Sequence, residues 1–245
     1  MYESRTYRQK MGSSRFNSLS LSIGESDLWI GYQPSLVDTD SMVHEAARYV
    51  RKLRNEILDY PDKTFLSRYT PLENSEPTTA LIEAMLKASC CSKTGPMASV
   101  AGAIAQALGI YLKEKFLLTE IVIENGGDLY IDVLQELSVK LIAPGNPLSG
   151  KLSLVVDVLH SPLGICTSSG KIGHSHSFGK ADAVMVACHE ASLADAYATA
   201  FCNRVQTKLD VQRICNEMNT HADIISAVVL LDDKLALCGE LEVRT

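Results

Sequence analysis

The sequence predicts an α+β protein in which a largely antiparallel sheet packs against helices. After a short hairpin, helical periodicity dominates the first half of the 245 residues, and strand-like apolar runs follow from residue 117. Strands and helices do not alternate regularly, which argues against a parallel βαβ sheet. The composition, 46% hydrophobic and 21% charged, is typical of a globular protein with a sizeable core.

No linker or low-complexity stretch divides the chain. We therefore expect one domain over residues 1–245, built either around a single core or as two closely fused lobes. The 23 basic and 29 acidic residues give a formal net charge of −6, which argues against nucleic acid as a partner. The densest basic cluster lies inside a helical pattern and is interpreted as a solvated helix face. It consists of Arg48, Arg51, Lys52 and Arg54.

Cysteine usage predicts a reducing, cytoplasmic location. The seven cysteines are odd in number and form no C-x-x-C pair, so neither a disulfide framework nor a zinc ribbon is indicated. The start of the chain, MYESRTYRQKMGSSRF, lacks the apolar core of a signal peptide. The most apolar run, residues 98–112, is too short for ~30 Å of hydrocarbon and is expected to be a buried helix, so no membrane partner is predicted.

The N-terminal half predicts a hairpin and three helices. Short β-prone runs at 19–23 and 28–32 flank the turn-like GESD. After the capping residues 38–41, apolar side chains recur at helical spacing over 42–57, and Pro61 ends the pattern. A polar connection over 61–77 precedes the second helix, 79–89, and the third helix, 98–112, carries small side chains that allow close backbone approach.

The C-terminal half predicts mainly strands. Period-two or continuous apolar runs occur at 119–123, 128–133, 138–143, 152–158, 164–168 and 183–187. Helical patterns follow at 191–205 and 210–218, and two final strands are expected at 224–231 and 235–243.

The first candidate motif is Asn-Gly-Gly-Asp at residues 125–128, between two β-prone runs. Gly126 and Gly127 can adopt positive φ, so the motif predicts a two-residue hairpin turn. Glycine N–H groups in such a turn also form a concavity that can hold a phosphate. The motif is therefore either a turn alone or a turn that also binds a phosphorylated ligand.

The second is a polar stretch, residues 167–180, between two hydrophobic runs. Its glycines lose extra backbone entropy on folding, and a bound ligand would offset that loss. On an extended chain His174 and His176 project to the same side, so a binding loop is favoured over a surface loop without a ligand. A zinc site is a further alternative, although its spacing matches no common pattern. It would use the two histidines with Cys166 and either Cys188 or His189.

The third is the predicted helix at 191–205. Asp195 and Thr199 are four residues apart and stack on one face, with Ser192 one turn earlier. A carboxylate beside a hydroxyl suits Mg²⁺, which takes few protein oxygens and completes its shell with water and phosphate. A solvated polar stripe is the alternative, but the other faces are apolar, so we expect a buried helix and a partner for Asp195.

Taken in order, the three motifs resemble the ApbE family of flavin transferases. In that family an N-G-G-D turn, a T/S-S-G strand end and an A-D-A-x-A-T-A helix line one site. Residues 125–128, 167–170 and 194–200 carry these motifs, and Asp182-Ala183-Val184 begins the strand before the helix. The resemblance covers residues 117–204 and reaches the N-terminal half only through the turn Gly95-Pro96-Met97.

The resemblance implies an ApbE-like, T-fold-related α+β fold and a flavin site. Family members bind FAD and, with Mg²⁺, transfer FMN to a threonine hydroxyl of an acceptor protein, or hydrolyse FAD. By this similarity Asp195 and Thr199 would ligate Mg²⁺, and the partners would be a flavin nucleotide and an acceptor protein. The implied FAD or FMN contacts are Gly95, Pro96, Met97, Asn125, Gly126, Gly127, Asp128, Thr167, Ser168, Ser169 and Gly170.

Two family segments are replaced in this chain. HSHSFGKADA stands in place of the family's H-x-x-D-P-x-T-G, and GPMASVAG in place of a lysine-glycine-tyrosine stretch near the third helix. Because the family's aspartate is missing from that loop, His174 or His176 becomes the candidate acid/base group. Three functions stay open: a Mg²⁺-assisted FAD enzyme, a non-catalytic flavin or nucleotide-binding module, and an assembly partner with a vestigial site.

Overall fold

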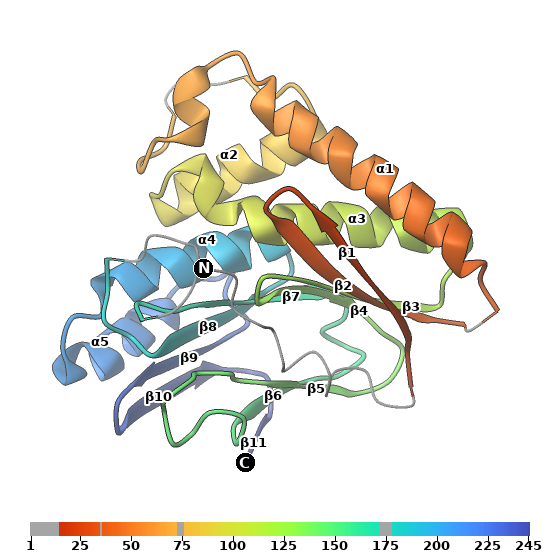
Figure 1. The fold of residues 1–245 in the computed structure, drawn as a ribbon. Helices are drawn as coiled ribbons and strands as arrows, with labels where there is room; N and C mark the ends of the chain where they lie inside the picture. Colours follow the sequence, from red (N-terminus) through yellow and green to blue (C-terminus); the bar gives the residue numbers. More distant parts are fainter. Residues whose placement is uncertain (1–14, 35, 73–75, 172–177) are drawn as a thin grey trace.

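The protein folds into a layer of helices, a large sheet and a small sheet (Figure 1). The computed structural model describes residues 15–34, 36–72, 76–171 and 178–245. In these residues every strand pairing is antiparallel, so the predicted α+β class with a largely antiparallel sheet is confirmed.

The large sheet has eight strands and the small sheet three. Across the large sheet the order is β1 (Asn17–Ile23), β2 (Ser26–Gln33), β3 (Glu120–Asn125), β4 (Asp128–Asp132), β7 (Leu163–Ser168), β8 (Ala183–Cys188), β9 (Ser226–Leu231) and β10 (Lys234–Gly239). The small sheet has the order β11 (Val243–Arg244), β6 (Ser153–Val156) and β5 (Leu137–Lys140).

Five α-helices and two short 3-10 helices form the helical layer of the described residues. They are α1 (Thr39–Leu58), η2 (Lys63–Leu66), α2 (Ala80–Ser92), η3 (Pro96–Ser99), α3 (Val100–Phe116), α4 (Ala191–Arg204) and α5 (Lys208–Met218). Capping begins two of them as the sequence indicates, because the side chains of Asp38 and Thr79 accept backbone hydrogen bonds at the starts of α1 and α2.

Side-chain alternation divides the large sheet between two cores. In β3, Ile121 and Ile123 pack toward α1 and α3, whereas Val122 packs toward the small sheet. The central strands β3, β8 and β9 are buried at every position. Burial on both faces explains why these strands appear in the sequence as continuous apolar runs.

Several predicted bounds are wrong: the expected helix 98–112 runs from Val100 to Phe116, and the expected strand 152–158 from Ser153 to Val156. The expected strand 235–243 is broken, because Gly239 adopts φ +101° against the backbone of Ile225 and the chain then crosses to the small sheet as β11. The expected strand 138–143 ends at Lys140. The expected polar connection 61–77 contains the 3-10 helix η2, which buries Phe65 completely.

The apolar helices α2 and α3 belong to the core. Among the described residues no single helix has the length and hydropathy of a membrane span. Only α2 and the η3–α3 segment taken together would reach that length and hydropathy, and the chain bends by 105° between them. Most of the apolar side chains of α2 and α3 pack against α1, α4 and the large sheet.

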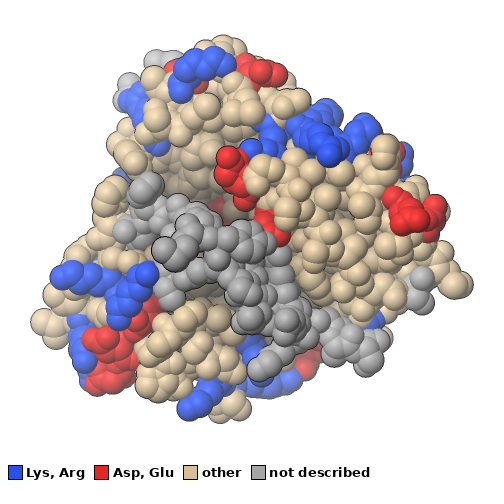
Figure 2. Space-filling view, in the orientation of Figure 1, with Lys and Arg blue, Asp and Glu red and all other residues tan. Residues whose placement is uncertain are grey.

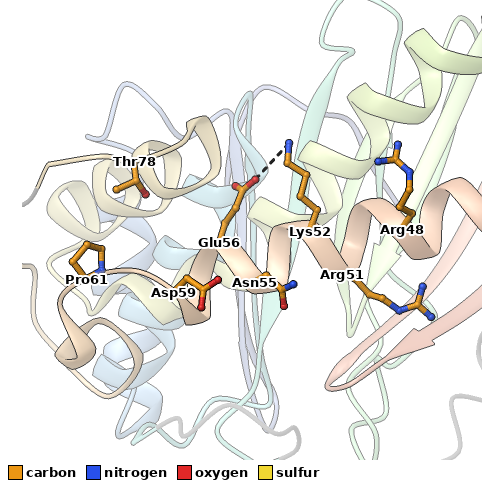
Figure 3. A pocket seen from close by; sticks show the side chains of 8 residues that line it. All are labelled: Arg48, Arg51, Lys52, Asn55, Glu56, Asp59, Pro61 and Thr78. Carbon is orange, nitrogen blue, oxygen red and sulfur yellow. Dashed lines mark ion pairs between the residues drawn. The ribbon is translucent and has the colours of Figure 1, made fainter.

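Basic side chains gather over α1 (Figure 2). Arg48 pairs with Glu45 and Lys52 pairs with Glu56 on the helix surface. Beside them lies a cavity of about 670 Å³ along α1 (Figure 3). It is lined by Arg48, Arg51, Lys52, Asn55, Glu56, Asp59, Pro61 and Thr78. No residue of the three motifs lines this cavity.

Candidate functional site

Helix α4 lies along β7 and brings the third motif onto the second (Figure 1). Its first residue, Ala191, packs directly on Gly164 of β7, where an added Cβ would overlap the Ala191 backbone. Toward the other end, Gly170 packs on Gly179, which in turn packs on Cys202 of α4. The segment that carries Thr-Ser-Ser-Gly therefore follows α4 from its first turn to its last.

Asp195 is buried between α4 and α3, with 8% of its surface exposed. Its Oδ2 accepts the N–H of Gly102, in the first turn of α3, at 2.9 Å. A Cβ on Gly102 would overlap the carbonyl oxygen of Ala191 and lie 3.0 Å from the Cβ of Asp195. The close backbone approach predicted for the third helix is thus present, and it supplies the partner that a buried Asp195 requires.

A second carboxylate, Asp128, lies beside Asp195. Asp128 begins β4, and its Oδ1 accepts the N–H of Thr167 at 3.3 Å. Burial, and then the charge of Asp128, raises the pKa of Asp195 well above its usual range, while the N–H of Gly102 acts in the opposite direction. Burial and these two carboxylates also raise the pKa of the Cys166 thiol, so Cys166 is a neutral side chain here.

The Asn-Gly-Gly-Asp motif forms the predicted two-residue hairpin between β3 and β4, with Asn125 paired to Asp128. Gly126 and Gly127 adopt φ +71° and +105°. The Asn125 Nδ2 donates to the carbonyl of Ala101 at 3.1 Å. The hairpin is therefore docked on the same turn of α3 that holds Asp195.

The sequence patterns did not single out Glu124 of β3, whose side chain accepts a hydrogen bond from this hairpin turn. Glu124 is 1% exposed, and its Oε1 accepts the N–H of Gly127 at 2.7 Å. A carboxylate in the residue before Asn-Gly-Gly-Asp, inside an otherwise apolar run, is the signal that could have identified it.

Thr199 lies one turn after Asp195 on α4 and is half-buried. Ser168 is buried at the end of β7, whereas Thr167, Ser169 and Gly170 are half-buried. The structure thus brings Asp195, Asp128 and Asn125 to one turn of α3 and places Thr199 next along the helix.

The remaining predicted flavin contacts, Ser169, Gly170 and the turn 95–97, have other partners than Asp195. Gly170 donates its N–H to the Ala181 carbonyl, and the Ser169 Oγ accepts the N–H of Lys171. In the turn before α3, Gly95 is wedged against the backbone of Arg68. Among the described residues no hydrogen bond joins Asp195 to Ser169, to Gly170 or to the turn 95–97.

The two candidate acid/base groups, His174 and His176, lie outside the described residues, so their roles stay predictions. The zinc alternative depends on the same two histidines. Within the described part of the chain, no group of three or more His, Cys, Asp or Glu side chains could hold a metal ion.

The donors around Asp195 suit a hard cation that brings its own ligands. The described partners of Asp195 are backbone N–H groups, and no Lys or Arg in the described ranges forms an ion pair with it. A buried carboxylate beside a second carboxylate is stabilised by a cation, and Thr199, one turn later on α4, is the nearest residue with an aliphatic hydroxyl along the helix in the C-terminal direction. So small a protein donor set fits Mg²⁺ shared with phosphate better than a cation caged by protein alone.

Two exposed aromatic rings stand where η3 approaches the end of α4. Tyr69 and Phe178 are 65% and 64% exposed, and their rings meet edge-on with centroids 5.8 Å apart. The N–H of Phe178 donates to Asn203 of α4 at 2.7 Å, and Arg68, next to Tyr69, packs on Gly95. Tyr69 therefore lies beside Gly95, and Phe178 contacts Tyr69 from the end of α4, although no pattern in the sequence pointed to either ring.

Comparison with known proteins agrees with the fold. A family model described as "AbpE bacteria" matches residues 8–235. The "Flavin Transferase ApbE from Vibrio cholerae" is similar in structure, with a TM-score of 0.61 at 12% identity, covering 91% of this chain and 96% of that one. The ApbE protein of Thermotoga maritima gives a TM-score of 0.59 at 9% identity, covering 92% and 97%. At these identities the structural likeness concerns the fold.

Curated relatives match at higher identity. The UPF0280 protein of Methanococcus aeolicus is 38% identical over 173 residues, 68% of this chain and 68% of that protein. The UPF0280 protein MJ1526 of Methanocaldococcus jannaschii is 33% identical over 213 residues, 84% and 85% of the two chains. The chain therefore belongs to the ApbE-like family described by the matching model, together with the UPF0280 proteins that it resembles over two thirds or more of their length.

Proposed function

We propose that this protein is a Mg²⁺-dependent enzyme that binds FAD and cleaves its pyrophosphate, with transfer of FMN to an acceptor protein or to water. The observation that carries the proposal is the buried Asp195 beside Asp128, at the turn of α3 on which the Asn-Gly-Gly-Asp hairpin is docked. The structural neighbours named as flavin transferases support flavin as the ligand.

In this proposal Asp195, Thr199 and Asp128 hold Mg²⁺. The cation would supply positive charge for the two phosphates and for the oxyanion that leaves with AMP. The N–H of Gly126 in the hairpin turn is a donor of the kind that binds phosphate oxygens, whereas the N–H of Gly127 already donates to Glu124. The carboxylates, fixed by the backbone of Gly102 and Thr167, would need little rearrangement when the nucleotide binds.

The aromatic pair Tyr69 and Phe178 supports a flat ring as part of the ligand. Two rings that expose about two thirds of their surface would gain apolar burial by packing on an isoalloxazine. His174 and His176 stay the proposed acid/base groups, since an imidazole can accept the acceptor's proton near neutral pH.

The test is incubation of the protein with FAD and Mg²⁺, followed by chromatography for FMN and AMP. Asp195→Asn keeps an oxygen for the Gly102 N–H and removes the charge, so the variant is expected to fold and to lose most product formation. Asp59→Asn is the matched control, because Asp59 is exposed at the end of α1 and its side chain forms no described hydrogen bond or ion pair. Absence of FMN and AMP from the wild type, or an Asp195→Asn variant as active as the control, would contradict the proposal.

A non-catalytic flavin-binding module is the second candidate. The observation that favours it is the replacement of H-x-x-D-P-x-T-G by HSHSFGKADA. A protein that purifies with bound flavin, binds FAD with Mg²⁺ and yields no FMN or AMP would assign this function. An assembly partner with a vestigial site would bind no flavin at all.

A further inference from the structure

A second polar cluster surrounds a cavity of about 360 Å³ between the chain after β7, the start of α5 and the β9–β10 turn. Three lysines and one aspartate line it, Lys171, Lys180, Lys208 and Asp232. The lining side chains carry three positive charges and one negative charge, and the carboxylates of Asp182 and Asp233, which pair with two of the lysines, bring the formal charge of the whole cluster to zero. The volume lies within the range of small-ligand pockets.

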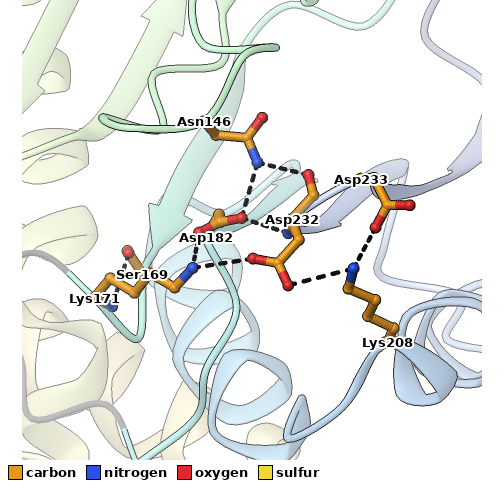
Figure 4. Close-up of polar contacts among 7 residues, drawn as sticks. All are labelled: Asn146, Ser169, Lys171, Asp182, Lys208, Asp232 and Asp233. Atoms are coloured by element: carbon orange, nitrogen blue, oxygen red, sulfur yellow. Dashed lines mark hydrogen bonds and ion pairs between the residues drawn. The ribbon is translucent and has the colours of Figure 1, made fainter.

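Asp232 joins two of the lysines across this cavity (Figure 4). Its Oδ1 lies 3.4 Å from the Nζ of Lys171 and its Oδ2 lies 3.6 Å from the Nζ of Lys208. Both distances are long for an ion pair, and each lysine has a closer partner, Asp182 and Asp233 respectively, at 2.5 Å. Asp232 therefore holds neither ammonium tightly.

A buried scaffold fixes this arrangement. Asp182 is 7% exposed, and its Oδ2 accepts the Asn146 Nδ2 at 2.8 Å and the N–H of Asp232 at 2.6 Å. Asn146 also donates to the Asp232 carbonyl at 2.8 Å. The position of Asp232, and through Asp182 that of Lys171, is thus set by the fold.

Lys180 supplies a positive charge that the described structure leaves uncompensated. Its backbone N–H donates to the Val205 carbonyl at 2.8 Å, which fixes its place on the wall, but its ammonium has no hydrogen bond or ion pair within the described residues. Gly170 and Gly179 meet beside it so closely that a Cβ on Gly170 would overlap the Gly179 carbonyl. Backbone rather than side chains therefore forms this wall.

We propose that this cavity binds a small phosphorylated anion of about the size of pyrophosphate. Lysine ammonium groups recognise phosphate oxygens as point charges, and three of them, two from the chain after β7 and one from α5, line this cavity. In the free protein the carboxylate of Asp232 forms ion pairs with Lys171 and Lys208. A bound anion would therefore compete with this carboxylate for the two ammonium groups. The cavity shares Gly170 with the implied flavin contacts, but none of its lining residues is proposed to hold Mg²⁺, and the proposal does not need a metal.

Calorimetric titration with pyrophosphate in excess EDTA tests the proposal. We expect saturable binding that weakens as KCl is raised, and an affinity about tenfold lower in Lys180→Gln. Lys151→Gln is the control, since Lys151 is exposed before β6 and forms no described ion pair. No saturable binding in the wild type, or equal affinity in Lys180→Gln and wild type, would overturn the site.

Two further variants fix the location. Asp232→Asn removes the competing charge while tolerating the φ of +53°, so pyrophosphate should bind several-fold more tightly. Weaker or unchanged binding in a folded Asp232→Asn protein would refute the competition. Asp195→Asn should bind pyrophosphate like the wild type, and loss of binding there would place the anion at the Asp195 site instead.

Discussion

Gly102 is the residue at which α3 and α4 touch. Its missing side chain lets the carbonyl of Ala191 lie against it, and its N–H reaches the carboxylate of Asp195. One residue therefore decides both the packing of two helices and the partner of a buried charge. Glycine is otherwise unfavourable within a helix, which shows that the contact outweighs the backbone cost.

Gly102→Ala should therefore destabilise the protein, although alanine favours a helix by about 1 kcal/mol. The overlap with the Ala191 backbone cannot be relieved by a side-chain rotation, so we expect a loss of about 1–3 kcal/mol in urea unfolding. Glu114→Ala is the comparison, because Glu114 is exposed on the same helix and its replacement leaves the contact with α4 in place. An equal loss in both variants would refute this account.

His160 gives the loop after β6 a pH-dependent contact. A hydrogen bond with Asp157 at 2.8 Å, opposed by burial and assisted by Glu240, raises the pKa of His160. A pKa raised on folding stabilises the protein fully below the unfolded value near 6.5, and that stabilisation is lost as the pH rises through the folded value.

The difference in unfolding free energy between wild type and His160→Asn should therefore shrink as the pH rises from about 6 through the raised pKa of His160. Urea unfolding across this range measures it, with His189→Asn as the exposed control. A difference that grows with pH would have the wrong sign for the proposed contact.

At the scale of elements, α4 has no capping side chain of its own at its start. The N–H of its first residue, Ala191, donates instead to the Oε1 of Gln106 on α3, at 2.6 Å. In the sequence Gln106 is a lone polar residue in an apolar run, and only the packing of the two helices shows that it caps a helix 85 residues later.

Gln106→Met should cost about 1–2 kcal/mol in unfolding free energy, because the Ala191 N–H loses its acceptor in a half-buried position. Gln106→Glu keeps an oxygen and places a negative charge at a helix N-terminus, so its loss should be smaller. Equal unfolding midpoints for the two variants would show that the hydrogen bond contributes nothing.

Most elements could be predicted because their patterns are local. Turn glycines, capping residues and hydrophobic period identified all five α-helices; the short 3-10 helix η3 was expected as a turn, and η2 and β11 were missed. Those two depend on distant contacts, the burial of Phe65 under α1 and α2 and the pairing of Val243 with Leu154 of β6. Local periodicity carries no information about either contact.

At the scale of the whole molecule, Asp182 ties the two sheets together. It stands before β8 of the large sheet, bonds the β9–β10 turn through the N–H of Asp232, and receives Asn146 from the loop between β5 and β6. Burial acts to raise its pKa, but Lys171, Asn146 and the Asp232 N–H together hold the pKa of Asp182 below its usual value. Its stabilising contribution is present above the unfolded value and lost as the pH falls through the folded one.

Asp182→Asn should therefore lower the unfolding free energy by about 2–4 kcal/mol, since one of three donors to the carboxylate would face an NH₂ group. Urea unfolding at neutral pH measures the loss, and Asp59→Asn, at an exposed carboxylate after α1, serves as the comparison. A loss no larger than that of Asp59→Asn would mean that the network does not link the sheets.

The sequence by itself determined the α+β class, the hairpin at 125–128 and the stacking of Asp195 on Thr199, because these depend on spacing and on turn residues. Only the tertiary structure decided that Asp195 lies beside Asp128, that Gly102 donates to it, and that three lysines surround one cavity. Such neighbours come from segments tens of residues apart, and their meeting is set by how helices and sheets pack rather than by any local pattern.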